Sequence, residues 1–447
     1  MSATQAQERL EKTVLAPLTR TGPLYKLVML ALLGVVGWGL YAYSVQLRRG
    51  LVVTDMRDYV SWGLYISNFV FFIGISHAGT LISAILRVTQ AGWRTPITRM
   101  AEFITVVALS VGALFPLIDM GRPDRVYNMI IHGRFQSPLV WDVLAISTYL
   151  TGSIIYLLLP LVEDLALCRD KLSNQVSPFK RIFYRVASLG WRGTPKQRRY
   201  LLTGMTIMAI LIIPIAVSVH TVVSFIFAMT LRAGWNSTVY GAYFVAGAIF
   251  SGIATIIIVM AILRKAFHLE EYLTQKQFVY LGYMLGAFVL IMAYFNLLEY
   301  LVPGYKMAEG ELFLLRMILT GDLAPLYWGY ILGGLVVPGL IILLPWTRNI
   351  TGLVVASILV DIAMWVERFL VVVPKLRVPQ MPYPAATYTP TWVEWSITAG
   401  SVAGFALIIA TFAKLFPVIS VWEVKEHMEA KPVEEAPSPT ELAGARE

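Results

Sequence analysis

Long apolar runs, separated by short polar segments, are the main pattern of this chain. A membrane-spanning helix needs about 20 consecutive, mostly apolar residues. Ten runs of that kind lie near residues 24–45, 59–86, 100–118, 140–162, 201–230, 239–263, 277–302, 327–345, 350–373 and 395–416. The pattern predicts an all-α polytopic membrane protein with about ten transmembrane helices.

The composition supports this class and argues against soluble and nucleic-acid-binding proteins. Of the 447 residues, 57% are hydrophobic and only 14% are charged, an excess that a soluble domain does not carry. The formal net charge of +9 does not indicate a nucleic-acid partner, because Lys and Arg lie between the apolar runs and not on one basic face. Most of them fall on the inner side when the amino terminus is cytoplasmic. We therefore expect both termini in the cytoplasm and no nucleic-acid partner.

An internal repeat predicts how the spans are grouped. The segment from Trp62 to Arg87 lines up with the segment from Tyr240 to Arg264, and both end in Ile-Leu-Arg. The alignment pairs Gly63 with Gly241, Tyr65 with Tyr243 and Gly74 with Gly252. Four spans per copy would keep both copies in one orientation, which predicts two parallel-repeat four-helix bundles flanked by two peripheral helices. The alternative is a chance likeness between membrane helices rich in Gly and aromatic residues.

The repeat divides the chain into six predicted segments. They are a cytoplasmic amino-terminal tail (1–23), a first peripheral helix with an outer loop (24–58), the first bundle (59–230), the second bundle (231–373), an outer Pro-rich loop with the last helix (374–422) and a disordered cytoplasmic tail (423–447).

Four ionisable side chains lie deep inside predicted spans. They are His77, Glu102, His220 and Asp361. An ionisable group in a bilayer costs several kcal/mol unless it is paired or hydrated, so each is a functional candidate, and together they predict a proton path. His77 has Thr255 at its repeat position, so only the first bundle would carry an imidazole at that depth. Hydrogen bonding inside a packed bundle, or haem ligation by His77 and His220, are the alternatives. For His220 and Asp361, a parallel route and a bridge between helices both remain open.

The loop between the third and fourth predicted spans carries a second set of polar residues on the outer side. Asp119 and Asp142 stand at its two ends, with Arg122 and Tyr127 between them. Such a pocket suits a quinone, because aromatic and aliphatic walls hold its ring and tail while carboxylates accept the protons released on oxidation. We predict Asp142 and Asp119 as catalytic residues, and both of them with Arg122, Tyr127 and His77 as the quinone-binding set. An interfacial cap of ion pairs is the alternative.

The number of cysteines limits which disulfides and iron–sulfur clusters the chain can form without a partner. Cys168 is the only cysteine, and one thiol can form neither an internal disulfide nor a four-cysteine iron–sulfur site. An electron-carrying cluster must then belong to another subunit. We predict no metal site in this chain.

Seven segments, in order along residues 56–425, carry a family resemblance. They read HAGTLISAILR, PLIDMGRP, SPLVWD, SVHTVVSFIFA, YFVAGAIFSG, SILVDIAMWVERF and YTPTWVEW. Together they resemble the NrfD/PsrC family, the polysulfide reductase NrfD-type integral membrane subunits that connect quinone to iron–sulfur subunits. Within that family the likeness is greatest to the ActC subunits of alternative complex III.

The resemblance implies a fold, a substrate and a set of partners. It implies two four-helix bundles with two flanking helices, no cofactor bound by the chain, and menaquinone or menaquinol as substrate in the first bundle. Asp142 matches the family's quinol-site aspartate, whereas Asp119 stands where the family usually has His. The implied partners are a ferredoxin-like iron–sulfur subunit on the outer side, other membrane subunits such as a second NrfD-type subunit, cytochrome c subunits, and membrane lipid.

Three functions remain as hypotheses. The leading one is a subunit, not catalytic alone, of an oxidoreductase complex in a bacterial cytoplasmic membrane. It would oxidise menaquinol, or reduce quinone, at the outer face, exchange electrons with the iron–sulfur partner and couple this step to proton translocation. A secondary transporter also suits parallel repeats with buried ionisable groups. A structural anchor whose quinone site has decayed is the third.

Overall fold

The computed structural model describes residues 3–237, 239–382 and 384–430, and these form helices and loops without a β-strand. Ten helical segments in them are long and apolar enough to cross a membrane. They are α2 (Pro23–Arg49), α3 (Leu64–Val88), α4 (Thr98–Asp119), α6 (Pro138–Leu172), α8 (Pro195–Ala228), α9 (Tyr240–Ala266), α10 (Gln275–Lys306), the run Ala324–Leu343, α14 (Ile350–Arg377) and α15 (Trp392–Leu415). The predicted all-α, ten-span fold class is confirmed.

The eighth span is not a regular α-helix. It consists of α12 (Ala324–Gly329), a π-helical segment (Tyr330–Val336) and α13 (Val337–Leu343). Segments of π-helix are rare and often occur at functional sites. In this span the segment carries Tyr330, which is buried in the second bundle.

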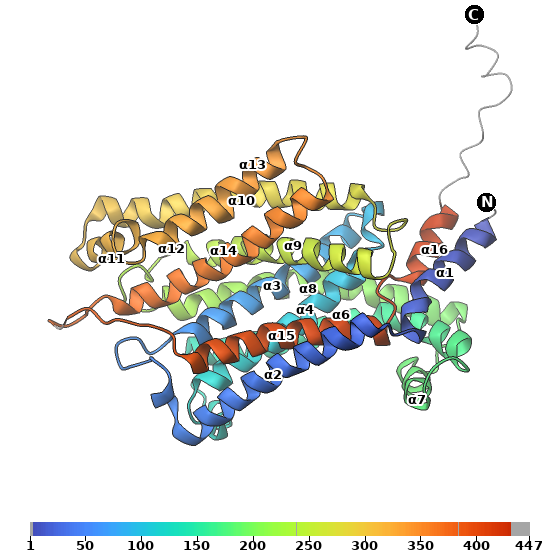
Figure 1. The fold of residues 1–447 in the computed structure, drawn as a ribbon, viewed down its shortest axis with the longest axis horizontal. Helices are drawn as coiled ribbons and strands as arrows, with labels where there is room; N and C mark the ends of the chain where they lie inside the picture. Colours follow the sequence, from blue (N-terminus) through green and yellow to red (C-terminus); the bar gives the residue numbers. More distant parts are fainter. Residues whose placement is uncertain (1–2, 238, 383, 431–447) are drawn as a thin grey trace, which may run out of the picture.

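The spans lie side by side along the long axis of the molecule (Figure 1). In the first bundle, α3 packs against α4 and α8, and α6 packs against the same two helices, which closes a ring of four. In the second bundle, α9 packs against α10 and α14, and α13 packs against the same two. The helices α3 and α9 also pack against each other, so the two bundles share one interface.

The glycines of the predicted repeat lie at this shared interface. A Cβ on Gly252 of α9 would stand 2.2 Å from Cβ of Ala78 on α3, a distance that packed atoms do not reach. A Cβ on Gly74 of α3 would stand 3.7 Å from Cα of Ala248 on α9. Small residues let membrane helices approach closely, because helix association in lipid depends on direct packing. The close approach of α3 and α9 therefore requires Gly at position 252, whereas a Cβ at Gly74 would make ordinary van der Waals contacts.

Two helices outside the bundles form a peripheral pair. α2 and α15 pack against each other along their length, and α15 also contacts α3 and α4. The two backbones meet at Gly39 and Gly400, where a Cβ on either residue would lie 2.9 Å from Cα of the other. The opposite face of α2 presents Leu27, Leu30 and other exposed apolar side chains. That face is suited to lipid or to another apolar surface.

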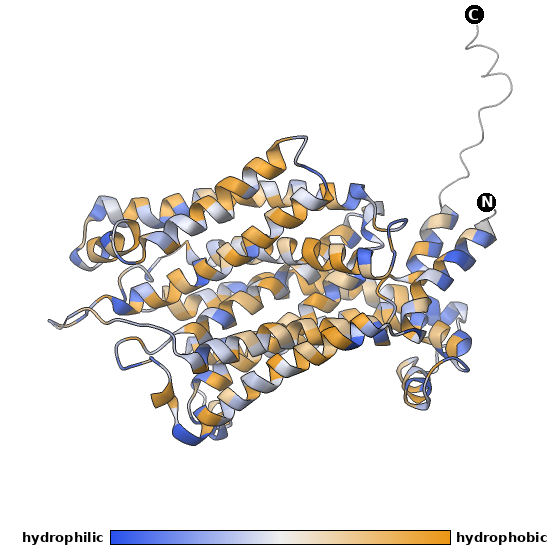
Figure 2. Cartoon of the chain, viewed as in Figure 1, coloured by the Kyte–Doolittle hydropathy of each residue, from blue (hydrophilic) through white to orange (hydrophobic). Residues whose placement is uncertain are grey.

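The ten spans run between two ends of the molecule, and Figure 2 shows hydrophilic residues gathered at both ends. The terminal end, named for the first and last described helices, holds α1 (Ala3–Thr19), α7 (Pro178–Ala187) and α16 (Val421–Ala430). The loop end holds the short helices Leu51–Val53, Pro123–Arg125 and α5 (Asn128–Ile131), together with α11 (Glu309–Leu319) and the Pro-rich segment after α14.

The terminal end is more ordered than the sequence predicts. The tail predicted as disordered from residue 423 begins inside helix α16, whose residues Glu423 and Val424 are buried. The prediction is wrong for residues 423–430, and the rest of that tail lies outside the described residues. Glu11 of α1 forms ion pairs with Lys171 and with Lys425 of α16. Although burial opposes it, these two ammonium groups hold the pKa of Glu11 below its usual value.

Candidate functional site

Polar side chains follow one face of α6 through the interior of the first bundle. Asp142, Tyr149, Ser153 and Tyr156 lie seven, four and three residues apart, which places them on one side of a helix. All four are buried. Because a polar stripe of this kind would cost free energy in lipid, it must face the inside of the bundle. Only Asp142 was predicted from the sequence, although the spacing was a readable signal.

Asp142 begins this stripe at the loop end. It lies four residues after Pro138, the first residue of α6, and it is 6% exposed. Its Oδ1 atom is buried without a hydrogen-bond partner among the described residues. Asp119, the last residue of the neighbouring helix α4, also has a buried and unpartnered Oδ1. Buried carboxylate oxygens are normally hydrogen-bonded, so these two are candidates to contact a ligand.

Arg122 and Tyr127 take different positions from the two carboxylates. Both are exposed, and Arg122 donates hydrogen bonds to Asp124, which is also exposed, at 3.2 Å. The structure therefore places Asp119 and Asp142 at the same end of the first bundle, whereas Arg122 pairs with Asp124 on the surface. A role of Arg122 and Tyr127 in quinone binding stays a prediction.

A hydrogen-bonded group that sequence reasoning missed supports the end of α4. Gln46 of α2 donates to the carbonyl of Ile118 at 2.7 Å, and Tyr65 of α3 donates to Oε1 of Gln46 at 2.6 Å. Gln46 and Tyr65 are buried. The residue next to Asp119 is thus fixed by the first peripheral helix, a contact that no local pattern in the sequence indicates.

The Pro-rich segment lies over the same end. Tyr388 donates to Glu394 at the start of α15 and accepts the backbone N–H of Leu64 at 2.8 Å. Burial, assisted by the charge of Glu394, raises the pKa of the Tyr388 phenol, which therefore remains a donor. A Cβ on Gly63 would stand 2.1 Å from Oη of Tyr388, so only Gly fits before α3. This explains one of the repeat glycines by a contact that the second copy does not share.

The two deep histidines of the first bundle face each other. The ring centroids of His77 on α3 and His220 on α8 are 4.2 Å apart, and the rings are tilted by 59°. Nε2 of His220 lies 3.1 Å from the carbonyl oxygen of Ile73, whereas neither ring nitrogen of His77 has a partner among the described residues. Two metal–nitrogen bonds of about 2 Å each would hold ring centroids farther apart than this. The haem alternative therefore does not fit the pair.

The second bundle has a matching pair at the repeat position. Thr255 of α9 donates to Oδ2 of Asp361 on α14 at 2.8 Å. Thr255 corresponds to His77, and Ser-Val-His at His220 aligns with Leu-Val-Asp at Asp361. Each pair thus joins the first and fourth helices of its own bundle. The structure groups His220 with His77 and pairs Asp361 with Thr255.

Glu102 belongs to a hydrogen-bonded chain that leads toward the terminal end. Ser83 donates to Oε1 of Glu102 at 2.6 Å, and its hydroxyl lies 3.3 Å from that of Tyr156. Nε of Arg87 donates to the Tyr156 hydroxyl at 3.3 Å. Oε2 of Glu102 is buried and unpartnered among the described residues.

Several hydroxyl groups lie inside the first bundle, between Glu102 and the loop end. Tyr149 and Thr105 both donate to the carbonyl of Ser76, at 3.0 and 2.7 Å. The hydroxyls of Thr80 and Ser153 are buried without a partner among the described residues. The first bundle therefore holds ionisable and hydroxyl groups from Asp142 at one end to Arg87 at the other.

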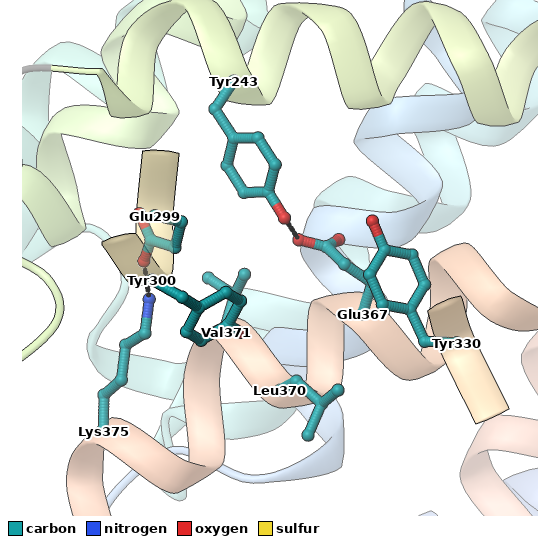
Figure 3. A pocket seen from close by; sticks show the side chains of 8 residues that line it. All are labelled: Tyr243, Glu299, Tyr300, Tyr330, Glu367, Leu370, Val371 and Lys375. Atoms are coloured by element: carbon teal, nitrogen blue, oxygen red, sulfur yellow. Dashed lines mark hydrogen bonds and ion pairs between the residues drawn. The ribbon is translucent and has the colours of Figure 1, made fainter. Parts of the chain in front are cut away.

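The second bundle encloses a separate ionic cluster near its loop end (Figure 3). Tyr243 of α9 points at Glu367 of α14 and donates to it, and Lys375 forms an ion pair with Glu299 at 2.7 Å. Arg368 lies 3.2 Å from Glu367. The cavity between these groups is about the size of one water molecule, which is too small for a quinone ring. Within the described residues no group of three or more His, Cys, Asp or Glu could hold a metal ion.

Comparison with known proteins places these features in a family. Residues 52–379 match the family model described as polysulphide reductase, NrfD. The chain belongs to the NrfD family. It is a multi-pass membrane protein, and the ordered motifs from which the family was predicted lie within or at the ends of α3, α4, α6, α8, α9, α14 and α15.

Relatives of nearly the same length share most of the chain. A membrane subunit of a putative dimethyl sulfoxide reductase from Halobacterium salinarum is 30% identical over 87% of this chain and 90% of its own. An Hdr-like menaquinol oxidoreductase integral membrane subunit of Archaeoglobus fulgidus is 23% identical, over 91% and 96%. The integral membrane subunit of a menaquinone reductase from Nitratidesulfovibrio vulgaris is 24% identical, over 86% and 89%. Each of these names describes a membrane subunit of an oxidoreductase.

Proposed function

We propose that this NrfD-family subunit binds menaquinol or a related quinone at the loop end of the first bundle, with Asp142 as the first proton acceptor. The observation that carries the proposal is the buried, unpartnered carboxylate oxygen of Asp142 at the mouth of a polar bundle interior. Two relatives named for menaquinol or menaquinone support the choice of substrate.

Oxidation of a quinol releases two electrons and two protons. Asp142 would form a new O–H bond with the first proton as the quinol O–H bond breaks, and Asp119 would be the second carboxylate at the site. The electrons leave for an iron–sulfur partner subunit, because a chain with the single cysteine Cys168 does not supply a four-cysteine site itself. Arg122, Tyr127 and His77 complete the quinone-binding set of the proposal. The same site would serve quinone reduction in the reverse direction.

The proposed orientation puts the loop end outside and both termini in the cytoplasm of a bacterium. The terminal end carries the segment between α6 and α8, which is rich in Lys and Arg, and positive residues favour the cytoplasmic side. The iron–sulfur subunit would then bind at the outer face. We also propose that the chain is a subunit of an alternative complex III, together with a second NrfD-type subunit and cytochrome c subunits.

Binding of a quinone analogue to the purified complex tests this function. We expect saturable binding of a menaquinone analogue, competed by menaquinol, and quinol oxidation only when the iron–sulfur subunit is present. The isolated chain in proteoliposomes should transport no solute. Solute flux through the isolated chain would favour a secondary transporter, and an intact complex that binds no analogue would favour a structural anchor.

A proton route through the first bundle is the second part of the proposal. Asp142, the His77–His220 pair and Glu102 are all buried in the first bundle, and the hydroxyl groups of Tyr149, Thr80 and Ser153 are buried in the same interior, as a path for protons requires. Asp361 lies in the other bundle with Thr255 and belongs to a separate route or to a helix bridge.

Substitutions of His77 and Glu102 test the route. In proteoliposomes that contain the complex, His77→Leu and Glu102→Gln should each lower the number of protons moved per electron severalfold, because each removes a titratable group. The exposed residues His132 and Glu271 provide the controls His132→Leu and Glu271→Gln, which should keep the wild-type ratio. Unchanged ratios in both interior variants would exclude these residues from the route.

A further inference from the structure

The carboxyl-terminal helix α16 covers the terminal end of the first bundle, and its residue Glu423 reaches inward. Glu423 is buried and accepts a hydrogen bond from Nη2 of Arg87 at 2.8 Å. Nη1 of Arg94 lies 3.6 Å from its other oxygen, Oε2. Oε2 is buried and has no hydrogen-bond partner among the described residues. Glu423 and Asp142 are thus both buried carboxylates with one oxygen that accepts no hydrogen bond among the described residues, and they lie at opposite ends of one bundle, but that oxygen of Glu423 also forms an ion pair with Arg94.

Arg87 holds Glu423 next to the phenol of Tyr156. Nε of Arg87 donates to Tyr156 and Nη2 donates to Glu423, and these two nitrogens lie on the same edge of the planar guanidinium. In Arg169 the same edge holds both oxygens of Asp170, at 2.7 and 3.0 Å. The Tyr156 and Glu423 oxygens are therefore held by adjacent nitrogens of one guanidinium group. A guanidinium does not give up its proton in proteins, so Arg87 is a positioning residue and not a relay.

The hydroxyl chain continues from Tyr156 through Ser83 to Glu102 in the bundle interior. We propose that Glu423 is the group that exchanges protons between this chain and the solvent at the terminal end. When Glu102 releases a proton, the hydroxyls of Ser83 and Tyr156 each accept one proton and pass one on. The carboxylate of Glu423 forms the new O–H bond, and no electrons move. This inference rests on the proton route of the proposed function.

Contacts other than those of Glu423 fix α16 in place. Asp164 of α6 accepts the backbone N–H groups of Val421 and Trp422 at 3.1 and 3.3 Å. The indole of Trp422 donates to the carbonyl of Pro160 at 3.0 Å. The variant Glu423→Gln should therefore leave the helix bound, because the amide keeps the size of the side chain and an oxygen that can accept from Arg87.

The experiment uses the whole complex in proteoliposomes and records quinol oxidation and proton movement together. Glu423→Gln cannot gain or lose a proton, so we expect the protons moved per electron to fall at least about tenfold. Glu423→Asp keeps a carboxylate and should restore part of the ratio. Glu426→Gln is the matched control, because Glu426 lies on the same helix but is about half exposed and pairs with Arg198. It should keep the wild-type ratio.

The possible failures differ in what they overturn. A wild-type complex that oxidises no quinol overturns the proposed function, and one that oxidises quinol without moving protons overturns the proton route together with the role of Glu423. A wild-type ratio in Glu423→Gln overturns the role of Glu423 alone. In the last case, Glu423→Gln and Glu423→Asp lower the ratio equally and lower the melting temperature equally. That result assigns Glu423 to the packing of α16 and also overturns its role in proton exchange.

Discussion

Replacement of Asp142 by Asn should slow quinol oxidation by the assembled complex at least about a hundredfold, the usual range for loss of a general base. The amide has nearly the size of the carboxylate, but it cannot accept the quinol proton at neutral pH. In the described part of the chain, Oδ1 of Asp142 has no hydrogen-bond partner, so the substitution breaks no bond at this atom. Folding and assembly should therefore survive. Steady-state oxidation of a menaquinol analogue, normalised to the amount of intact complex, measures the effect.

Two companion variants make the result specific. Asp124→Asn changes an exposed carboxylate at the same end, which is paired with Arg122, and should leave the rate unchanged within about twofold. Asp142→Glu retains a carboxylate and should keep more activity than Asp142→Asn. An Asp142→Asn complex with the wild-type rate would remove Asp142 from the mechanism, even if quinone still binds.

Loss of the buried Arg99–Asp164 ion pair should give the largest effect on stability. Both side chains are essentially inaccessible, and Arg99 also donates to the carbonyl of Pro160 at 2.9 Å. Arg99→Met would leave the Asp164 carboxylate buried without its partner, which costs about 3–5 kcal/mol. We expect a strongly lowered melting temperature in detergent, or loss of the folded subunit from the membrane.

The double variant separates the charge from the packing. Arg99→Met combined with Asp164→Asn removes both charges and keeps an oxygen that can accept the backbone N–H groups of Val421 and Trp422, so it should be more stable than Arg99→Met alone. The exposed pair of Arg198 with Glu426 offers a matched control, because Arg198→Met should change stability by less than about 1 kcal/mol. If the double variant is no more stable than Arg99→Met, the buried charge of Asp164 is not the source of the loss.

The spans and their grouping could be predicted because they depend on local pattern. Apolar runs long enough to cross a bilayer identify helices without tertiary information. The repeat glycines Gly74 and Gly252 could be matched because small residues are common where membrane helices cross, and at Gly252 a Cβ would not fit. The ion pairs that order residues 423–430 could not be predicted, because Glu423 and its partner Arg87 are more than 300 residues apart in sequence.

The candidate site was predicted in part. Depth in a span identified His77 and Glu102 as candidates, and the place at the end of the outer loop identified Asp142. Neither signal could show that His77 faces His220 or that Glu102 joins a hydroxyl chain. Such pairings depend on helix rotation, which is set by packing between helices. Arg122 shows another limit, because its nearness in sequence to Asp119 did not predict its pairing with Asp124 on the surface.

The contact between the two ends of the chain bears on how the protein is made. α2 packs against α15, and α1 packs against α15 and α16, so helices that leave the ribosome early have their main neighbours among helices that leave it much later. Until α16 has been synthesised, Glu11 cannot reach Lys425, and the apolar face of α2 that α15 later covers remains open. During synthesis the first peripheral helix therefore lies in the bilayer without its partner, and the peripheral pair forms only after α15 has inserted.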